Sequence, residues 1–93
     1  MSRPKYALIK DDELSRILLE ALAEQEHNQW VEWSKSVAAS ENLSPERVSR
    51  WSKLWVAYAQ LQEDQKENDR LWARKSIEIL ENAIRITRAK TKL

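Results

Sequence analysis

The sequence predicts an all-α fold: a small three-helix domain in which two long helices bracket a short one, preceded by an N-terminal extended arm. Composition is the first reason, because the 93 residues contain no glycine and only two prolines, and helix-forming residues dominate. Periodicity is the second, because apolar residues recur at steps of three and four along two long stretches. A single domain over residues 1–93 is expected, because a chain of this length supports one hydrophobic core.

Residues 1–10 are expected to form the extended arm, because Pro4 disfavours helix before it. The first long helix is predicted over residues 12–39, with Asp11 and Asp12 as candidate N-caps. A helix that is apolar on two faces is either sandwiched between neighbours or part of an oligomer interface. The longer apolar side carries Leu19, Ala23, Trp30, Trp33 and Val37. The shorter one, in the first half of the helix, carries Leu14, Ile17, Leu18 and Ala21.

A short helix is predicted over residues 45–56, with Ser44 as its N-cap and Pro45 at its first position. Its apolar residues Val48, Trp51 and Trp55 follow at spacings of three and four. We expect a break in the chain over residues 57–61 before the next helix begins.

The third helix is predicted over residues 62–87, and its apolar stripe becomes ionic towards the N-terminus. In that direction the stripe meets Arg70 and Lys66, with Asp69 on its flank. Charges on a core-facing stripe must be paired, be exposed, or be offered to a ligand, and this choice is the functional question. The apolar part of the stripe consists of Ala73, Ile77, Leu80 and Ile84.

The composition excludes several classes of protein. Without glycine the chain has no Walker loop, no dinucleotide fingerprint and no type I′ hairpin. Without cysteine, and with one histidine, it has neither a disulfide scaffold nor a Cys/His metal site, so no metal or other cofactor is expected. No apolar run approaches the length of a membrane span and no signal peptide is visible, so we expect a cytoplasmic protein.

Charge is unevenly distributed along the chain. Residues 11–81 carry nine Lys/Arg and fifteen Asp/Glu, whereas the two ends carry seven Lys/Arg and no acid. A duplex-binding domain usually carries positive charge on its folded body. Nucleic acid is therefore the least expected macromolecular partner. If the protein does bind nucleic acid, the basic ends of the chain would make the contact.

Tryptophan is unusually frequent for so short a chain. Each indole carries one N–H donor that needs a partner when the ring is buried. So many rings indicate either a tryptophan-rich core or a pocket walled by rings. The five positions are Trp30, Trp33, Trp51, Trp55 and Trp72.

Three motifs, in this order, resemble the Ry domain, the module repeated in ryanodine receptors and found alone in bacterial and phage proteins. The resemblance covers about residues 19–81. The motifs are Leu22-Ala23-x-x-x-His27-x-x-Trp30, then Tyr58-x-x-Leu61, then Lys66-Glu67-x-Asp69-Arg70.

The resemblance implies a mainly helical domain whose first and last helices bracket a shared polar cleft. It also implies sensing of a nucleotide-derived ligand, because bacterial relatives are often fused to nucleotide-signalling and defence components. Receptor-type members carry a glycine-containing segment and a hairpin after the first helix, where this chain has the glycine-free residues 44–55. The chain is closest to short stand-alone phage and prophage members, so a phage protein acting in the host cytoplasm is expected.

The candidate ligand-binding residues allow a functional and a structural interpretation. In the functional one, basic side chains bind a phosphate or carboxylate, an aspartate orients them or accepts from a ribose hydroxyl, and aromatic rings stack on a base. In the structural one, the same charges pair within the protein and pin the third helix to the first. The candidates are His27, Trp30, Trp33, Tyr58, Lys66, Asp69 and Arg70.

Catalysis is not expected. His27 has only Glu26 and Asp69 as plausible partners for acid–base chemistry, and a hydrogen-bonded histidine at the edge of the core is the simpler interpretation. The sequence predicts a non-enzymatic module that binds an anionic, nucleotide-derived ligand between the first and last helices, as a sensor or as a phage sponge for a defence signal. The alternative is a helical protein–protein interaction protein, a homodimer or a binder of a host partner, whose polar cluster is purely structural.

Overall fold

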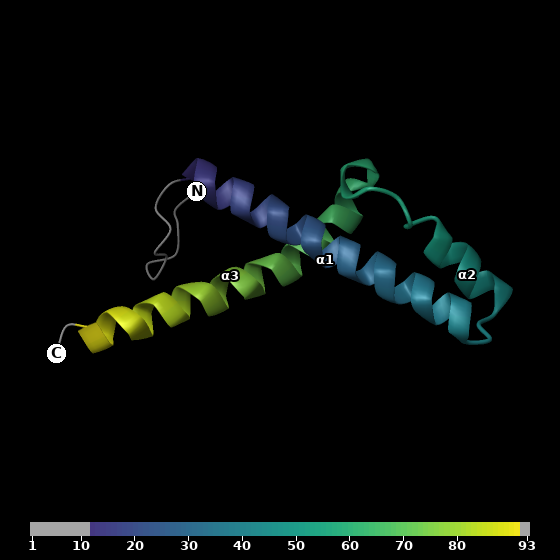
Figure 1. Ribbon diagram of the computed structural model, residues 1–93. Helices are drawn as coiled ribbons and strands as arrows, with labels where there is room; N and C mark the ends of the chain where they lie inside the picture. Colours follow the sequence, from purple (N-terminus) through teal and green to yellow (C-terminus); the bar gives the residue numbers. More distant parts are fainter. Residues whose placement is uncertain (1–11, 92–93) are drawn as a thin grey trace.

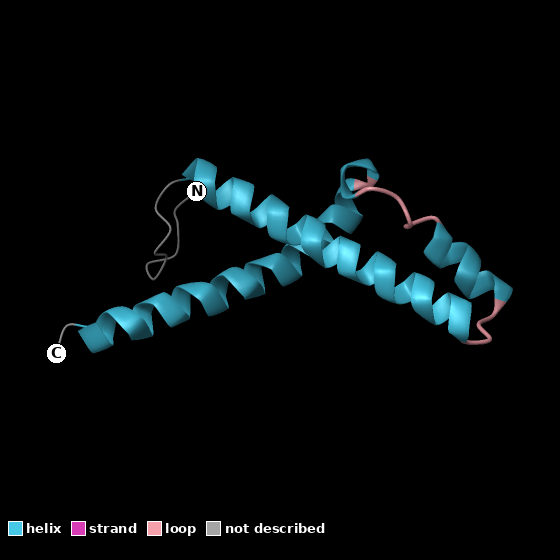
Figure 2. Ribbon diagram, in the orientation of Figure 1, coloured by secondary structure: helices cyan, strands magenta, loops and turns pink. Residues whose placement is uncertain are grey.

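The protein is described by a computed structural model that covers residues 12–91, with the side chain of residue 91 left out. The elements are α1 (Asp12–Ser40), α2 (Pro45–Ser52), a 3₁₀ turn η1 (Tyr58–Gln60) and α3 (Glu63–Thr91). The predicted all-α class with three helices is confirmed, and no strand occurs in the described residues (Figures 1 and 2). The arm predicted over residues 1–10 and the N-cap candidate Asp11 lie outside the described residues.

The two long helices cross each other, and their far ends diverge (Figure 1). Each has 29 residues and is therefore about 43 Å long at 1.5 Å per residue. α2 lies beside the second half of α1 (Figure 1). The Cα radius of gyration is 17.4 Å, compared with about 12 Å for a compact domain of this length. The fold is therefore elongated, and its packing is concentrated at one crossing.

The core lies at this crossing and is thin. Ala23 of α1 and Ala73 of α3 are fully buried, and such small side chains let two helices approach closely. Tyr58 of η1 and Leu61 just after it complete the buried apolar set of the described residues. Three half-buried leucines pack against this set: Leu19, Leu22 and Leu54.

The buried side of α1 differs from the predicted stripe. It runs through Ala23, His27 and Ser34, whereas the predicted Trp33 is 57% exposed. Ser34 faces inwards because its hydroxyl accepts a hydrogen bond from the indole Nε1 of Trp55 at 2.9 Å. Trp33 turns instead towards α2, where its ring centre lies 5.7 Å from that of Trp51. The prediction that Trp33 belongs to the core-facing side was therefore wrong.

The predicted stripe of α3 is correct at three of its four positions and wrong at the fourth. Ala73 is buried and Ile77 and Ile84 are half-buried, but Leu80 is 44% exposed, and its neighbour Glu81 is buried.

The N-cap of α2 is confirmed, but its end lies earlier than predicted. Ser44 accepts a hydrogen bond from the backbone N–H of Arg47 at 3.2 Å, and the helix ends at Ser52 instead of residue 56. After Ser52 two hydrogen bonds join the chain to α1. The indole of Trp55 donates to the hydroxyl of Ser34, and the backbone oxygen of Val56 accepts from the ring of His27. These contacts oppose a continued helix, and the predicted break contains η1. α3 begins at Glu63 and continues to Thr91, four residues beyond the predicted end.

The tryptophans form a cluster between α1 and α2 instead of a buried core. Trp51 of α2 contacts Trp30 edge-on, with ring centres 5.9 Å apart, and also contacts Trp33. Edge-on and tilted pairs of this kind add to the stability that area burial alone supplies. This cluster holds α2 on α1.

We expect Ala23→Leu to lower the free energy of unfolding by about 1–3 kcal/mol, because the larger side chain overpacks the crossing. Urea denaturation followed by circular dichroism measures the change. Ala21→Leu is the matched control, since Ala21 is exposed two residues earlier on the same helix, and a shift within about 0.5 kcal/mol is expected there. Equal effects of the two substitutions would contradict the crossing described above.

Candidate functional site

One polar cluster ties the three parts of the crossing together. Arg70 of α3 donates two hydrogen bonds to Glu20 of α1, from Nε to Oε2 at 2.7 Å and from Nη2 to Oε1 at 2.9 Å. The hydroxyl of Tyr58 in η1 donates to Glu20 Oε1 at 3.2 Å. We call Glu20, Tyr58 and Arg70 the clasp. Such two-point arginine–carboxylate pairs fix geometry as well as adding stability.

The remaining donors of Arg70 are also used within the protein. Nη1 donates to Glu63 at 3.0 Å and to Glu67 at 3.4 Å. Lys66 Nζ lies 3.8 Å from Glu63 and 5.7 Å from the ring centre of Tyr58. The two cations predicted to bind an anion are therefore surrounded by protein carboxylates.

The contacts within the clasp shift the pKa values of its three residues. The hydrogen bonds that Arg70 donates to Glu20 lower the pKa of Glu20, and those that it donates to Glu20 and Glu63 raise the pKa of Arg70. Burial of the phenol, and after it the negative charge of Glu20, raise the pKa of Tyr58 to about 12. At neutral pH the clasp thus consists of a carboxylate, a guanidinium and a neutral phenol.

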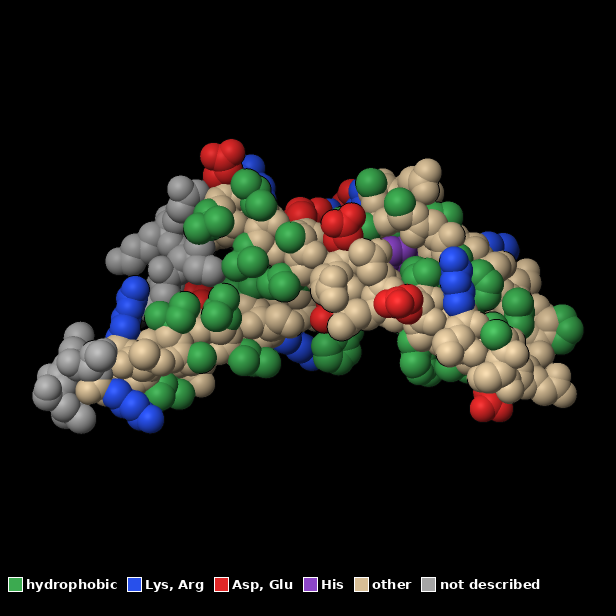
Figure 3. Space-filling model, viewed as in Figure 1, with side chains coloured by type: hydrophobic (Ala, Val, Ile, Leu, Met, Phe, Trp, Pro, Cys, Tyr) green, Lys and Arg blue, Asp and Glu red, His purple; other side chains and the backbone are tan. Residues whose placement is uncertain are grey.

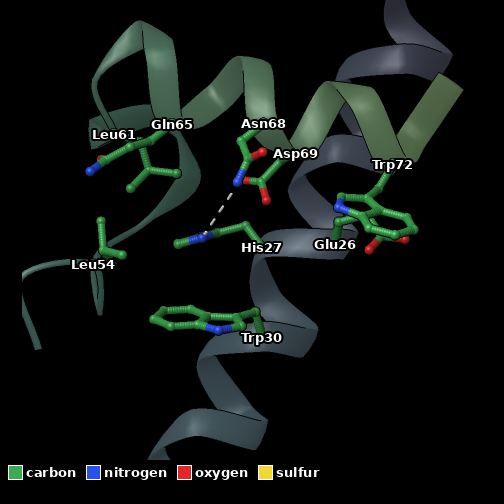
Figure 4. A pocket seen from close by; sticks show the side chains of 9 residues that line it. All are labelled: Glu26, His27, Trp30, Leu54, Leu61, Gln65, Asn68, Asp69 and Trp72. Atoms are coloured by element: carbon green, nitrogen blue, oxygen red, sulfur yellow. Dashed lines mark ion pairs between the residues drawn. The ribbon is translucent and has the colours of Figure 1, made fainter. Parts of the chain in front are cut away.

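A cleft of about 350 Å³ lies beside the clasp, between α1 and α3 (Figure 4). Its volume is at the lower end of the range for small-molecule sites, roughly 300–1,000 Å³. In Figure 4, His27 lies between Asp69 on one side and the ring of Trp30 on the other. The lining residues come from α1, the segment around η1 and α3, and are Glu26, His27, Trp30, Leu54, Leu61, Gln65, Asn68, Asp69 and Trp72.

His27 is 3% exposed, and its tautomer follows from its partners. Nε2 lies 2.7 Å from the backbone oxygen of Val56, and a carbonyl can only accept, so Nε2 carries a hydrogen. Nδ1 has no hydrogen-bond partner among the described residues, and it faces Asp69 Oδ2 at 3.9 Å. Nδ1 is an acceptor in the neutral ring, and it forms an ion pair with the Asp69 carboxylate when the ring is protonated.

The cleft carries two carboxylates, Asp69 and Glu26. Burial raises the pKa of Asp69, with His27 opposing the shift and the carboxylate of Glu26 adding to it. Among the described residues, the ion-pair partner of Asp69 is the imidazole of His27, and neither carboxylate pairs with a lysine or arginine. The cleft is therefore acidic, and His27 is the group in it that can offset the charge of Asp69.

The predicted ligand-binding residues are divided between three places. His27, Trp30 and Asp69 line the cleft. Tyr58 and Arg70 form the clasp, with Lys66 beside it, and Trp33 faces α2. The prediction missed Glu20, although its spacing of seven residues from His27 places both on one side of a helix. It also missed lining residues for which the sequence carried no specific signal: Leu54, Gln65, Asn68 and Trp72.

Two structural features are absent from the described part of the chain. No group of histidine, aspartate and glutamate side chains within residues 12–91 is placed to hold a metal ion. Among the same residues, no helix has the length and apolar character that crossing a membrane requires.

Comparison of the chain with family models, with curated proteins and with solved structures gives no match in any of the three. The resemblance to the Ry domain therefore stays a prediction.

We expect Arg70→Lys to lower the free energy of unfolding by about 1–2 kcal/mol, because lysine cannot make the two-point contact with Glu20. Chemical denaturation measures this loss. Arg74→Lys is the control, because Arg74 is half exposed and its ion-pair partner among the described residues is Glu67, at 2.8 Å, so its midpoint should stay unchanged. A wild-type midpoint for Arg70→Lys would show that the clasp does not hold the crossing.

We expect Asp69→Asn to change how stability depends on pH. Because burial raises the pKa of Asp69 above its ordinary 3.8, protonation of Asp69 contributes stability that is complete below pH 3.8. That contribution is lost as pH rises through the raised pKa, and the Asp69→Asn variant has no such loss. Its stability relative to the wild type should therefore increase over this interval, as measured by urea denaturation at a series of pH values. A decrease would mean that the Asp69 carboxylate is stabilised where it lies.

Proposed function

We propose that the protein is a non-enzymatic helical interaction protein that completes its apolar surface by pairing with a second copy of itself. The observation that carries the proposal is a second apolar stripe on α3, separate from the stripe that contains the buried Ala73. We call this the outer stripe; its residues are Trp72, Ile79 and Ile86, which are 53%, 72% and 51% exposed.

The outer stripe has the spacing of a helix-pairing surface. Its three residues follow at intervals of seven, so they line up along one side of α3, about 150° around the helix from the stripe that contains Ala73 and Ile77. Large apolar side chains repeated in this way on solvent-facing helix surfaces mark interaction sites.

α1 contributes exposed apolar side chains as well. Ile17 is 60% exposed and Leu14 is 53% exposed, on the shorter apolar side predicted for this helix. Figure 3 shows hydrophobic side chains gathered over the first half of α1 and along the diverging part of α3. The exposed apolar surface therefore lies mainly where the two helices separate.

The exposed area matches what a stable dimer buries. The chain exposes 7386 Å², whereas a compact monomer of 11.0 kDa exposes about 5,600 Å². The excess is about 1,800 Å² per chain, and two chains together would bury about 3,600 Å² if they covered it. Obligate homodimer interfaces bury about 2,000–5,000 Å² in total.

Charge favours a second copy over an unrelated partner. α3 carries Glu63 and Asp64 in its first turn and Arg88 and Lys90 in its last. Of these residues, Asp64 and Lys90 lie nearest the outer stripe around the helix, so antiparallel pairing along it would direct the acidic start of each α3 towards the basic end of the other. Such an arrangement is closed by a two-fold axis, as in most homodimers.

A ligand in the α1–α3 cleft is the second candidate function, and the aromatic wall of the cleft favours it. The nucleotide-derived ligand predicted from the sequence would stack its base on Trp30, and Asp69 would accept from its hydroxyl or amino groups. This candidate is compatible with a dimer that pairs through the outer stripe. The carboxylates around the cleft oppose the phosphates of such a ligand.

We expect the wild type to sediment with twice the 11.0 kDa chain mass at micromolar concentration, and Ile79→Glu to sediment with the mass of one chain. A charge in the centre of the outer stripe has no partner once it is buried by a second copy. Analytical ultracentrifugation measures both masses. Ser49→Glu places the same charge on an exposed position of α2 and should leave the dimer intact. A wild type that stays monomeric over the whole concentration range would refute the proposal.

A further inference from the structure

The outer stripe and the α3 wall of the cleft lie on one side of the same helix. From Ile79 and Trp72 of the outer stripe, steps of four and three towards the N-terminus lead to Asn68 and Gln65. Such steps follow one side of an α-helix. Gln65, Asn68 and Trp72 are also residues with which α3 lines the cleft, together with Asp69 (Figure 4). A helix that pairs along the outer stripe therefore meets the cleft at Trp72.

The spacing of the outer stripe selects one register for an antiparallel pair. Its three residues are evenly spaced about Ile79, so a two-fold axis at Ile79 places Ile86 of the second copy opposite Trp72. In this register every residue of the stripe faces a residue of the same stripe. Asn68 and Lys90 lie eleven residues before and after Ile79, which is about three helical turns, so they share its side of α3. Lys90 of the second copy then lies opposite Asn68.

The surfaces that this register brings together are exposed in the single chain. Trp72 is 53% exposed, although the ammonium of Lys75 lies 4.3 Å from the centre of its ring, and Ile86 is 51% exposed. Asn68 and Lys90 are exposed as well. Mutual cover of Trp72 and Ile86 removes apolar area from water on both copies, which stabilises the pair.

Charge at the two ends of α3 favours the same register. The first turn of α3 is acidic and the last turn is basic. Asp64 lies one turn before Asn68, so an ammonium of Lys90 placed opposite Asn68 is within reach of Asp64. A parallel pair would place acid beside acid and base beside base. Exposed ion pairs of this kind contribute little affinity, but they select orientation and register.

We infer that a second copy completes the cleft between α1 and α3 with the last turns of its own α3. Ile86 of the second copy covers Trp72 at the edge of the cleft, and Lys90 of the second copy covers Asn68 and pairs with Asp64. The inference rests on the pairing proposed above and adds to it a wall of the cleft that the partner supplies. Each cleft is therefore shared between two chains, and the dimer contains two of them.

Disulfide trapping tests the contact between Asn68 and Lys90, because the chain has no cysteine of its own. We expect the double variant Asn68→Cys, Lys90→Cys to run mainly as a covalent dimer after mild oxidation, since disulfides join residues whose Cα atoms lie roughly 4.4–6.8 Å apart. Arg74→Cys combined with Lys90→Cys is the matched control. Residue 74 lies about 140° around α3 from Ile79, so this variant should stay at the background level of collisional cross-linking. Non-reducing electrophoresis measures both, and circular dichroism confirms that each variant is folded.

Charge reversal tests the same register without cysteines. Asp64→Lys and Lys90→Glu should each weaken the dimer about three- to tenfold, because each reverses one charge in both symmetry-related pairs. The double variant should recover the wild-type dissociation constant, as measured by analytical ultracentrifugation. Within one chain the two residues are about 39 Å apart along α3, so only a contact between copies explains recovery. Lys53→Glu, at an exposed position just after α2, is the control and should leave the constant unchanged.

The outcomes separate the shared cleft from the pairing itself. A wild type that is monomeric at every concentration contradicts both. A wild-type dimer in which residues 68 and 90 do not cross-link above the control, or whose dissociation constant the double charge variant does not recover, overturns the shared cleft alone. Pairing then uses another register.

Discussion

The two hydrogen bonds between Arg70 and Glu20 are the constraint on which the other features depend. They join residues 50 positions apart in the chain and fix where α3 crosses α1. Because Ala23 and Ala73 let the helices approach only near this point, the helices separate on both sides of it. The same crossing therefore forms the thin core, opens the cleft beside it, and leaves the outer stripe without cover.

Two neighbouring residues of α3, Asp69 and Arg70, point into different sites at this crossing. Arg70 is directed into the clasp, and each of its three side-chain nitrogens donates to a carboxylate. Asp69, about 100° away around the helix, is directed into the cleft beside His27. The clasp joins the helices, and the cleft keeps Asp69 beside His27. The outer stripe and the cleft meet at Trp72, which belongs to both.

Local sequence signals were enough to predict the helices and the N-cap of α2, because capping and periodicity act within a few residues. Long-range side-chain contacts were not predictable in this way. Trp55 lies at helical spacing from Trp51, yet its bond to Ser34 of α1 takes it out of α2. For the site, periodicity placed His27 and Asp69 on facing helices. It gave no indication that the Arg70 guanidinium would be hydrogen-bonded to Glu20. The expected anion site is therefore surrounded by protein carboxylates.

Pairing of two α3 helices in opposite directions is the central claim, and a distance between the two chains tests it most directly. The natural chain has no cysteine, so Ala89→Cys allows one spin label per chain at an exposed position. If the two-fold axis passes near Ile79, residue 89 lies ten residues from it in each chain, and the labels should be about 30 Å apart in the dimer. Pulsed electron paramagnetic resonance measures this separation. A distance near 30 Å is the predicted result, and a distance near 10 Å, or no coupling between chains, would contradict it.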